Sequence, residues 1–218
     1  MKAVVLLILL VPFVHCQDIE SDVELVEPKS TNSLDKDLQD FMALIPTGKV
    51  LNTALTYVFK DKQVKELYEY VTKSPEFKEL FKNAMETSDV RNLLALLDSY
   101  GLPVTKTLND INVFLGFPPF KPPKVELRAP YGGVNGLIYD ILRLLPRQKI
   151  IALYYDKINN SEAFQRLINN LTSEQTIGAT IRVATNPEVQ KAYAALNKRG
   201  VDIFAIGREI VVYFLDLY

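Results

Sequence analysis

The sequence LQDFMALIP at residues 38–46 is matched by IYDILRLLP at residues 138–146, one hundred positions further along the chain. In both copies apolar residues recur with the i, i+3, i+4, i+7 spacing of an amphipathic helix, and a proline then ends the helix. Further helical stripes recur in the same order, with a one-residue gap expected near Ser88. The recurrence predicts a tandem duplication, with a first repeat at residues 38–116 and a second at 134–218 that together form one globular domain.

Turn residues mark where the predicted helices begin and end. Residues 74–76 (Ser-Pro-Glu) and 186–188 (Asn-Pro-Glu) each provide an N-cap, a proline at the first helical position and an acid at the positive end of the helix dipole. Gly101 and Gly200 follow apolar stripes, as glycines at C-terminal helix ends do. The predicted helices cover residues 37–45, 48–60, 61–73, 75–86, 89–100, 104–115, 134–145, 147–158, 160–171, 174–185, 187–199 and 202–217. No period-two run of β-branched residues competes with them, so the sequence predicts an all-α fold of about twelve short helices.

The first sixteen residues have the composition of a secretory signal peptide. A basic start at Lys2 precedes an apolar run at residues 3–14, which is shorter than the roughly 20 residues that a membrane-spanning helix needs, and acidic residues follow. We therefore expect residues 1–16 to be a signal peptide that is cleaved after Cys16, and the rest of the chain to be secreted.

Two segments lie outside the predicted helices of the repeats. Residues 17–37 are acidic and are expected to form an N-terminal arm, and residues 117–133 are rich in proline and are expected to form a non-helical connector. The whole chain carries 25 basic and 26 acidic side chains, so there is no basic footprint and no nucleic-acid partner is expected.

Cys16 is the only cysteine and His15 the only histidine, and both would leave with the signal peptide. Nucleophilic and general acid–base catalysis most often use these residue types. Carboxylates such as Asp98, Asp140 and Glu209 are available, but no pair of them stands out in the sequence. We therefore expect no enzymatic activity and assign no catalytic residue. No Cys/His cluster remains to hold a metal ion, so neither a metal nor a cofactor is expected.

The segment at residues 201–217 is apolar on almost every side of the helix that it is predicted to form. Such a helix is either buried all round or faces an apolar partner that is not protein. We expect it at the centre of the second repeat.

Four short motifs occur at the predicted helix ends and turns. They are the Ile-Pro and Leu-Pro pairs that end at Pro46 and Pro146, Ser-Pro-Glu-Phe-Lys at residues 74–78, Tyr-Gly-Leu-Pro-Val at residues 100–104, and FLGFPP at residues 114–119. Together they resemble the insect allergen-related repeat family, which includes cockroach midgut allergens, mosquito midgut microvillar proteins and the nitrile-specifier proteins of some butterflies. The second repeat is looser, because Gln-Thr-Ile stands at residues 175–177 where the first has Pro-Glu-Phe.

The resemblance implies a shell of helices around one large apolar cavity that holds fatty acyl chains or phospholipid. On this basis we predict a monomeric lipid carrier of the insect midgut lumen or microvillar surface, with long-chain lipids as its ligands. Transient membrane contact, and lysis of cells or enveloped particles through lipid exchange, are further expectations. A non-catalytic structural protein of the microvillar or peritrophic layer, and a detoxifying specifier protein, stay open as alternatives.

The apolar stripes supply the side chains that are expected to line such a cavity. Ile177 and Ile181 are included because they match Phe77 and Phe81 at an offset of one hundred. The expected lining consists of Leu67, Val71, Phe77, Phe81, Leu93, Leu97, Ile111, Phe114, Leu167, Leu171, Ile177, Ile181, Tyr193, Leu196, Ile203, Ile206, Ile210 and Phe214. Separately, Asn159 and Asn170 begin Asn-X-Ser/Thr sequences, so both are expected to carry N-linked glycans.

Overall fold

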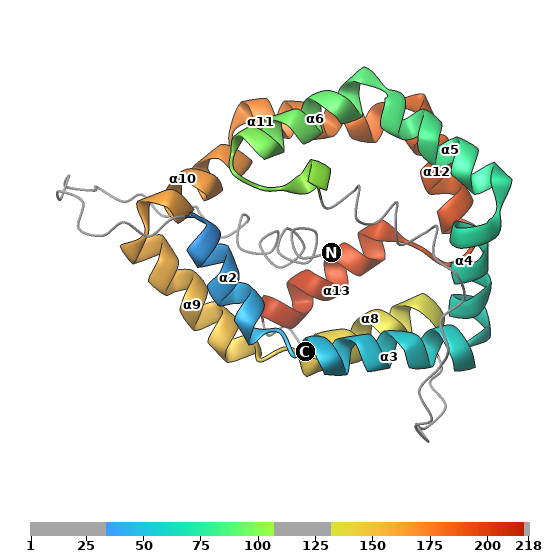
Figure 1. Cartoon of the computed structure of the whole chain (residues 1–218), viewed down its shortest axis with the longest axis horizontal. Coiled ribbons are helices and arrows are strands. Elements are labelled where there is room, and N and C mark those ends of the chain that lie inside the picture. Colours follow the sequence, from blue (N-terminus) through green and yellow to red (C-terminus); the bar gives the residue numbers. More distant parts are fainter. Residues whose placement is uncertain (1–33, 107–131, 216–218) are drawn as a thin grey trace.

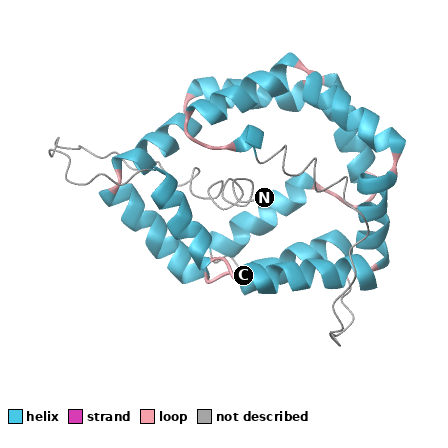
Figure 2. Ribbon diagram, viewed as in Figure 1, coloured by secondary structure: helices cyan, strands magenta, loops and turns pink. Residues whose placement is uncertain are grey.

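The computed structural model describes residues 34–106 and 132–215, and within these ranges it contains α-helices and no strand (Figure 1, Figure 2). The first half contains α2 (Leu34–Leu44), α3 (Thr47–Lys60), α4 (Lys62–Lys73), α5 (Pro75–Glu86) and α6 (Ser88–Ser99). The second half contains α8 (Gly133–Leu144), α9 (Arg147–Asn160), α10 (Glu162–Leu171), α11 (Glu174–Thr185), α12 (Pro187–Asn197) and α13 (Ile203–Leu215). The predicted all-α fold is confirmed.

The predicted helix ends are formed by the expected residues. The Ser74 hydroxyl accepts the Phe77 N–H at the start of α5, and the Asn186 side chain accepts the Glu188 N–H at the start of α12. Gly101 and Gly200 adopt φ angles of 86° and 90°, a left-handed conformation that ends a helix at little cost only for glycine. Turn chemistry therefore sets the lengths of the helices.

The helices of the two halves pair reciprocally along a ring (Figure 1). Helix α3 packs on α8 while α2 packs on α9, and α5 packs on α12 while α6 packs on α11. In this view α13 runs across the middle of the ring. Reciprocal contacts of this kind are what two copies of one unit make when they pack about a two-fold axis.

The one-residue shift between the halves lies earlier than the sequence predicts. Helices α3 and α9 begin one hundred residues apart, at Thr47 and Arg147, but α5 and α11 begin ninety-nine residues apart, at Pro75 and Glu174. Ser173 caps α11 by accepting the N–H of the third helical residue, as Ser74 does for α5. The caps fix the helix starts, so the gap lies before α5 and α11 and not near Ser88.

Helix α2 begins at Leu34, inside the segment that the sequence assigns to an acidic arm at residues 17–37. The rest of that arm, the signal peptide, most of the connector and most of the predicted helix at 104–115 lie outside the described residues. In the part of the chain that is described, every helix is too short or too polar to cross a membrane.

Candidate functional site

Three apolar clusters hold the described helices together. The first joins α2, α8, α9, α10 and α13 to the end of α6, around the stacked rings of Phe41 and Phe164, whose centroids lie 5.4 Å apart. The second surrounds Tyr57 where α3 and α4 meet α8, and the third surrounds Tyr70 and Phe77 where α4 and α5 meet α12.

Most of the predicted lining residues lie in these clusters. Those in or against the first cluster are Leu93, Leu97, Leu167, Leu171, Ile206, Ile210 and Phe214. Those in or against the third are Val71, Phe77, Phe81 and Leu196, and Leu67 packs against the second. The lining residues are thus spread over three clusters, and each cluster is packed with protein side chains.

The remaining predicted lining residues are placed differently. Ile177, Ile181 and Ile203 are exposed, and Tyr193 is half-buried with its ring edge-on to Phe204 at 6.3 Å. Ile111 and Phe114 lie outside the described residues.

The exposure of Ile177 and Ile181 follows from the start of α11. At an offset of ninety-nine, Phe77 of α5 corresponds to Thr176, which is buried together with Ala179 on the inner face of α11. The two isoleucines therefore lie one position past the buried face. In the described structure they are apolar side chains that lack a protein covering.

Helix α13 is buried at one end only. Ile210 and Phe214 lie in the first cluster, but Ile203 is 51% exposed and Phe204 is 77% exposed. The burial on all sides that the sequence suggests is therefore absent at the N-terminal end of this helix. At that end the side chains of Ile203 and Phe204 form an exposed apolar surface.

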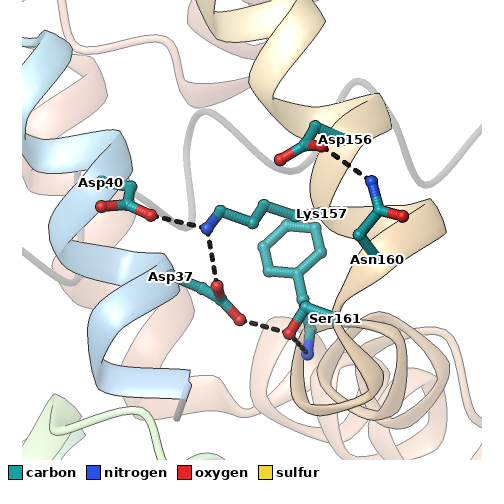
Figure 3. Close-up of polar contacts among 7 residues, drawn as sticks. Asp37, Asp40, Asp156, Lys157, Asn160 and Ser161 are labelled. Atoms are coloured by element: carbon teal, nitrogen blue, oxygen red, sulfur yellow. Dashed lines mark hydrogen bonds and ion pairs between the residues drawn. The ribbon is translucent and has the colours of Figure 1, made fainter. Parts of the chain in front are cut away.

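A buried ion pair joins α2 of the first half to α9 of the second (Figure 3). The Nζ atom of Lys157 lies 2.8 Å from Asp37 Oδ1 and 2.5 Å from Asp40 Oδ2. The hydroxyl of Ser161, which caps α10, donates to Asp37 and accepts the Phe164 N–H. We call Asp37, Asp40, Lys157 and Ser161 the lysine junction.

Two of the three charged side chains of the lysine junction are held away from water, and Asp40 is half-exposed. Asp37 is 0% exposed and Lys157 is 5% exposed, so each needs the other, because an unpaired buried charge is costly. Burial alone would lower the pKa of Lys157, but the hydrogen bonds and charges of Asp37 and Asp40 outweigh it, and the net pKa is raised. Lys157 therefore stays charged at neutral pH.

A second junction joins α3 and α4 of the first half to α8 of the second. The buried Tyr57 donates its hydroxyl to Asp140 Oδ2 at 2.8 Å. Asp61 accepts the Val64 N–H at 3.0 Å with one oxygen and the Gly133 N–H at 3.1 Å with the other, so one buried carboxylate caps both α4 and α8. We call Tyr57, Asp61, Gly133 and Asp140 the tyrosine junction.

Two details fix the chemistry of the tyrosine junction. Burial first, and then the hydrogen bond and charge of Asp140, raise the pKa of Tyr57, which keeps its hydroxyl protonated as a donor. Gly133 has a φ angle of +60°, a backbone conformation that other residues rarely adopt, and a Cβ atom there would displace the side chain of Gln63, so the position favours glycine.

Sequence comparisons place this architecture among known proteins. The family described as insect allergen related repeat, nitrile-specifier detoxification, matches residues 33–206. Protein G12 of Anopheles gambiae is 31% identical over 179 residues, which cover 80% of this chain and 83% of that relative. The chain belongs to the insect allergen-related repeat family. The resemblance inferred from the sequence motifs is confirmed.

Neither junction of this insect allergen-related repeat protein is among the sites predicted from sequence. In the sequence Asp37 lies where the acidic arm meets the first predicted helix, and no signal there gave Lys157 a role. One signal was available, because Asp37 lies four residues before Phe41 and therefore on the same helix face. A carboxylate on an apolar face indicates a buried cation opposite to it.

The two predicted glycosylation sites lie near helix ends. Asn159 is exposed in the last turn of α9, and the serine of its sequon is the buried Ser161. Asn170 is half-buried near the end of α10, where its backbone carbonyl accepts the Thr176 hydroxyl at 2.7 Å. Glycosylation at both sites stays a prediction.

Proposed function

We propose that the protein is a secreted carrier that encloses long-chain lipid, as fatty acyl chains or phospholipid, against the apolar sides of its helices. The observation that carries the proposal is the N-terminal end of α13. This helix lies across the middle of the ring, and its Ile203 and Phe204 are more than half exposed (Figure 1). Large apolar side chains that are left uncovered in this way favour a non-protein apolar partner.

The energy available from covering these side chains is substantial. Fully burying an isoleucine or phenylalanine side chain stabilises by roughly 1.5–3 kcal/mol, so covering the exposed Ile177, Ile181, Ile203 and Phe204 would contribute several kcal/mol. Lipid bound to the folded state would also stabilise it by mass action, by about 2.7 kcal/mol at one hundred times the dissociation constant.

The proposed activity is binding without turnover. Residues 17–218 contain neither histidine nor cysteine, which are the commonest catalytic groups for acid–base and nucleophilic work. The family description includes nitrile-specifier detoxification, and a detoxifying role is therefore an alternative that the same purified protein can test. A structural protein that covers the same side chains by self-association is the other alternative.

The proposal extends to where the carrier works. We place it outside the cell, in the midgut lumen or on the microvillar surface of an insect, as a monomer with glycans on Asn159 and Asn170. Exchange of acyl chains with a membrane would account for lysis of cells or enveloped particles. Glycosidase treatment of protein secreted from eukaryotic cells should lower its mass at both sites.

Lipid extraction and mass spectrometry of the purified protein test the central claim. Long-chain lipid should be recovered, delipidated protein should melt at a lower temperature, and added C16–C18 fatty acid should restore the melting temperature. Protein that carries no lipid and gains no stability from fatty acid would refute the carrier function. Concentration-dependent self-association in place of lipid binding would favour the structural alternative, and formation of a nitrile from an added substrate would favour the detoxifying one.

A matched pair of variants separates lipid contact from a general surface effect. The double variant Ile203→Ser/Phe204→Ser removes exposed apolar surface from α13, and Leu51→Ser/Tyr155→Ser removes comparably exposed surface from α3 and α9. Only the α13 variant should lose affinity for fatty acid. Equal losses in both would contradict a site at α13.

A further inference from the structure

A small pocket lies at the corner between α5 and α6. It has a volume of about 380 Å³, within the usual range for small-molecule sites, and is lined by Phe81, Lys82, Met85, Glu86 and Arg91. Two of these side chains are apolar and two are cationic. The pocket therefore combines an apolar wall with a local excess of positive charge.

The guanidinium of Arg91 is held by two hydrogen bonds and has N–H donors that these bonds do not use. Its Nε atom donates to the Glu86 carbonyl at 2.9 Å, and one Nη2 hydrogen donates to the same oxygen. Arginine has five N–H donors, and the described residues supply no acceptor to the other three. The unused end of the guanidinium presents two parallel N–H groups, which is the geometry that binds a carboxylate through both oxygens.

Lys82 lines the same pocket as Arg91, and its ion pair with Glu86 is weak. Its Nζ atom lies 3.8 Å from Glu86 Oε1, beyond hydrogen-bond distance, and both side chains are largely exposed. An anion in the pocket would therefore meet two cations and only one carboxylate.

The second half of the chain shows that the hydrogen bond to the end of the preceding helix does not require the positive charge of Arg91. At the position of Arg91, α12 carries Gln190, which donates to the Ala184 carbonyl at the end of α11 at 3.3 Å. A neutral amide thus caps the preceding helix there. Ile181 stands at the position of Lys82, so both cations belong to the first half only.

The apolar wall of the pocket is continuous with the third apolar cluster. The Phe81 ring stacks on Phe77 with centroids 6.0 Å apart, and Phe77 is buried in the third cluster with Tyr70. An amphiphile could therefore place a charged head at Arg91 and lay the start of its chain against Phe81 and Met85.

We propose that the pocket between α5 and α6 binds the carboxylate of a long-chain fatty acid and so orients the lipid in the carrier, an inference that rests on the proposed function. Arg91 holds the head through its free N–H pair, and Lys82 adds the second charge. Phe81 and Met85 contact the first methylene groups of the chain.

The test compares two probes that have the same twelve-carbon chain, of which only one carries a charged headgroup. Laurate and 1-dodecanol are titrated into delipidated full-length protein, with acetate as a headgroup that lacks the chain. In Lys82→Gln/Arg91→Gln the affinity for laurate should fall about tenfold or more, while that for 1-dodecanol should stay within about twofold, because a tenfold change corresponds to the loss of one good charged contact. Acetate should not bind measurably.

The controls make each outcome decisive. Arg91→Gln copies the capping amide of Gln190, so the fold should be retained, and its melting temperature verifies this. Lys62→Gln removes an equivalent exposed lysine, whose pair with Glu66 spans 3.9 Å, and should change neither affinity. Unchanged laurate affinity, or equal losses for both probes, would overturn the headgroup site while leaving the carrier intact. Wild-type protein that binds neither probe would overturn both proposals.

Discussion

The lysine junction and the tyrosine junction use corresponding positions of the two halves with different chemistry. Lys157 corresponds to Tyr57 at an offset of one hundred, and each meets an aspartate of the opposite half, Asp40 or Asp140. Asp37, which also contacts Lys157, corresponds to Leu137, which packs against the cluster around Tyr57. The buried ammonium thus contacts two carboxylates, whereas the buried phenol donates to one carboxylate and has the apolar Leu137 at the position equivalent to Asp37.

The difference follows from how much each donor must be compensated. A buried ammonium carries a full charge and three N–H donors, so a single half-exposed carboxylate leaves it under-compensated. A phenol is neutral and has one O–H, which Asp140 accepts, while the nearby Asp61 is satisfied by the Val64 and Gly133 N–H groups. A further carboxylate at position 137 would therefore be a buried charge without a partner. The residue pairs Asp37 with Lys157 and Leu137 with Tyr57 are therefore matched sets, and exchanging one member alone should be costly.

The largest effect should come from Lys157→Met, which keeps the aliphatic stem and removes the charge. Asp37 is left fully buried without its cation, a loss of about 3–5 kcal/mol in the free energy of unfolding. Urea denaturation followed by circular dichroism measures it, since the chain has no tryptophan to report by fluorescence. The matched control is Lys191→Met, because Lys191 lies 2.6 Å from Glu188 on an exposed helix face and its loss should cost less than about 1 kcal/mol. Similar losses for the two variants would show that the lysine junction contributes no more than a surface pair.

Converting the lysine junction into the tyrosine junction should recover much of that loss. In Asp37→Leu/Lys157→Tyr the buried charge pair is absent, and the new phenol can donate to Asp40 as Tyr57 does to Asp140. Replacing a buried ion pair by apolar groups is often close to neutral, so the double variant should regain more than half of the stability lost in Lys157→Met. The Ser161 hydroxyl loses its acceptor, which limits the recovery by about 1 kcal/mol or more. A double variant less stable than Lys157→Met would contradict the matched-set interpretation.

Tyr57→Phe should cost less than Lys157→Met. It removes one hydrogen bond to a carboxylate that is half-exposed and can turn to water, a loss of about 1–2 kcal/mol. The same urea series measures it. A loss as large as that of Lys157→Met would mean that the two junctions contribute equally in spite of their different charges.

The sequence predicts the helices well because their ends depend on local chemistry. The residues at 74–76 and 186–188 cap and start α5 and α12 as expected, and Gly101 and Gly200 end α6 and α12 with positive φ angles. Apolar spacing adds the faces between these ends. Such signals act over one or two turns and need no knowledge of the tertiary structure.

The register of α11 and the two junctions could not be predicted in the same way. Ile177 and Phe77 are both apolar and lie one hundred residues apart, but the N-cap Ser173 starts α11 so that Thr176 takes the buried position. The partners of Lys157 lie more than one hundred residues away, and no local rule pairs them. The sequence shows that a charge lies on a helix, but the tertiary contact decides whether it is buried.

The smallest predicted effect distinguishes the junctions by pH. Both Tyr57 and Lys157 have a raised pKa in the folded protein, so each binds its proton more tightly when folded than when unfolded. The stability that each contributes is fully present below its usual pKa, 10.0 for tyrosine and 10.5 for lysine, and is lost as the pH rises through the folded value.

Tyr57→Phe and Lys157→Met each lack one of these titrating groups. The difference in unfolding free energy between wild type and each variant should therefore narrow as the pH rises. The narrowing should begin near pH 10.0 for Tyr57→Phe and near pH 10.5 for Lys157→Met. The raised pKa values of Tyr70 and Tyr213 are common to all three proteins and cancel in the comparison. Urea series at stepwise alkaline pH would show the narrowing, and gaps that stay constant through this range would mean that neither proton is held by its junction.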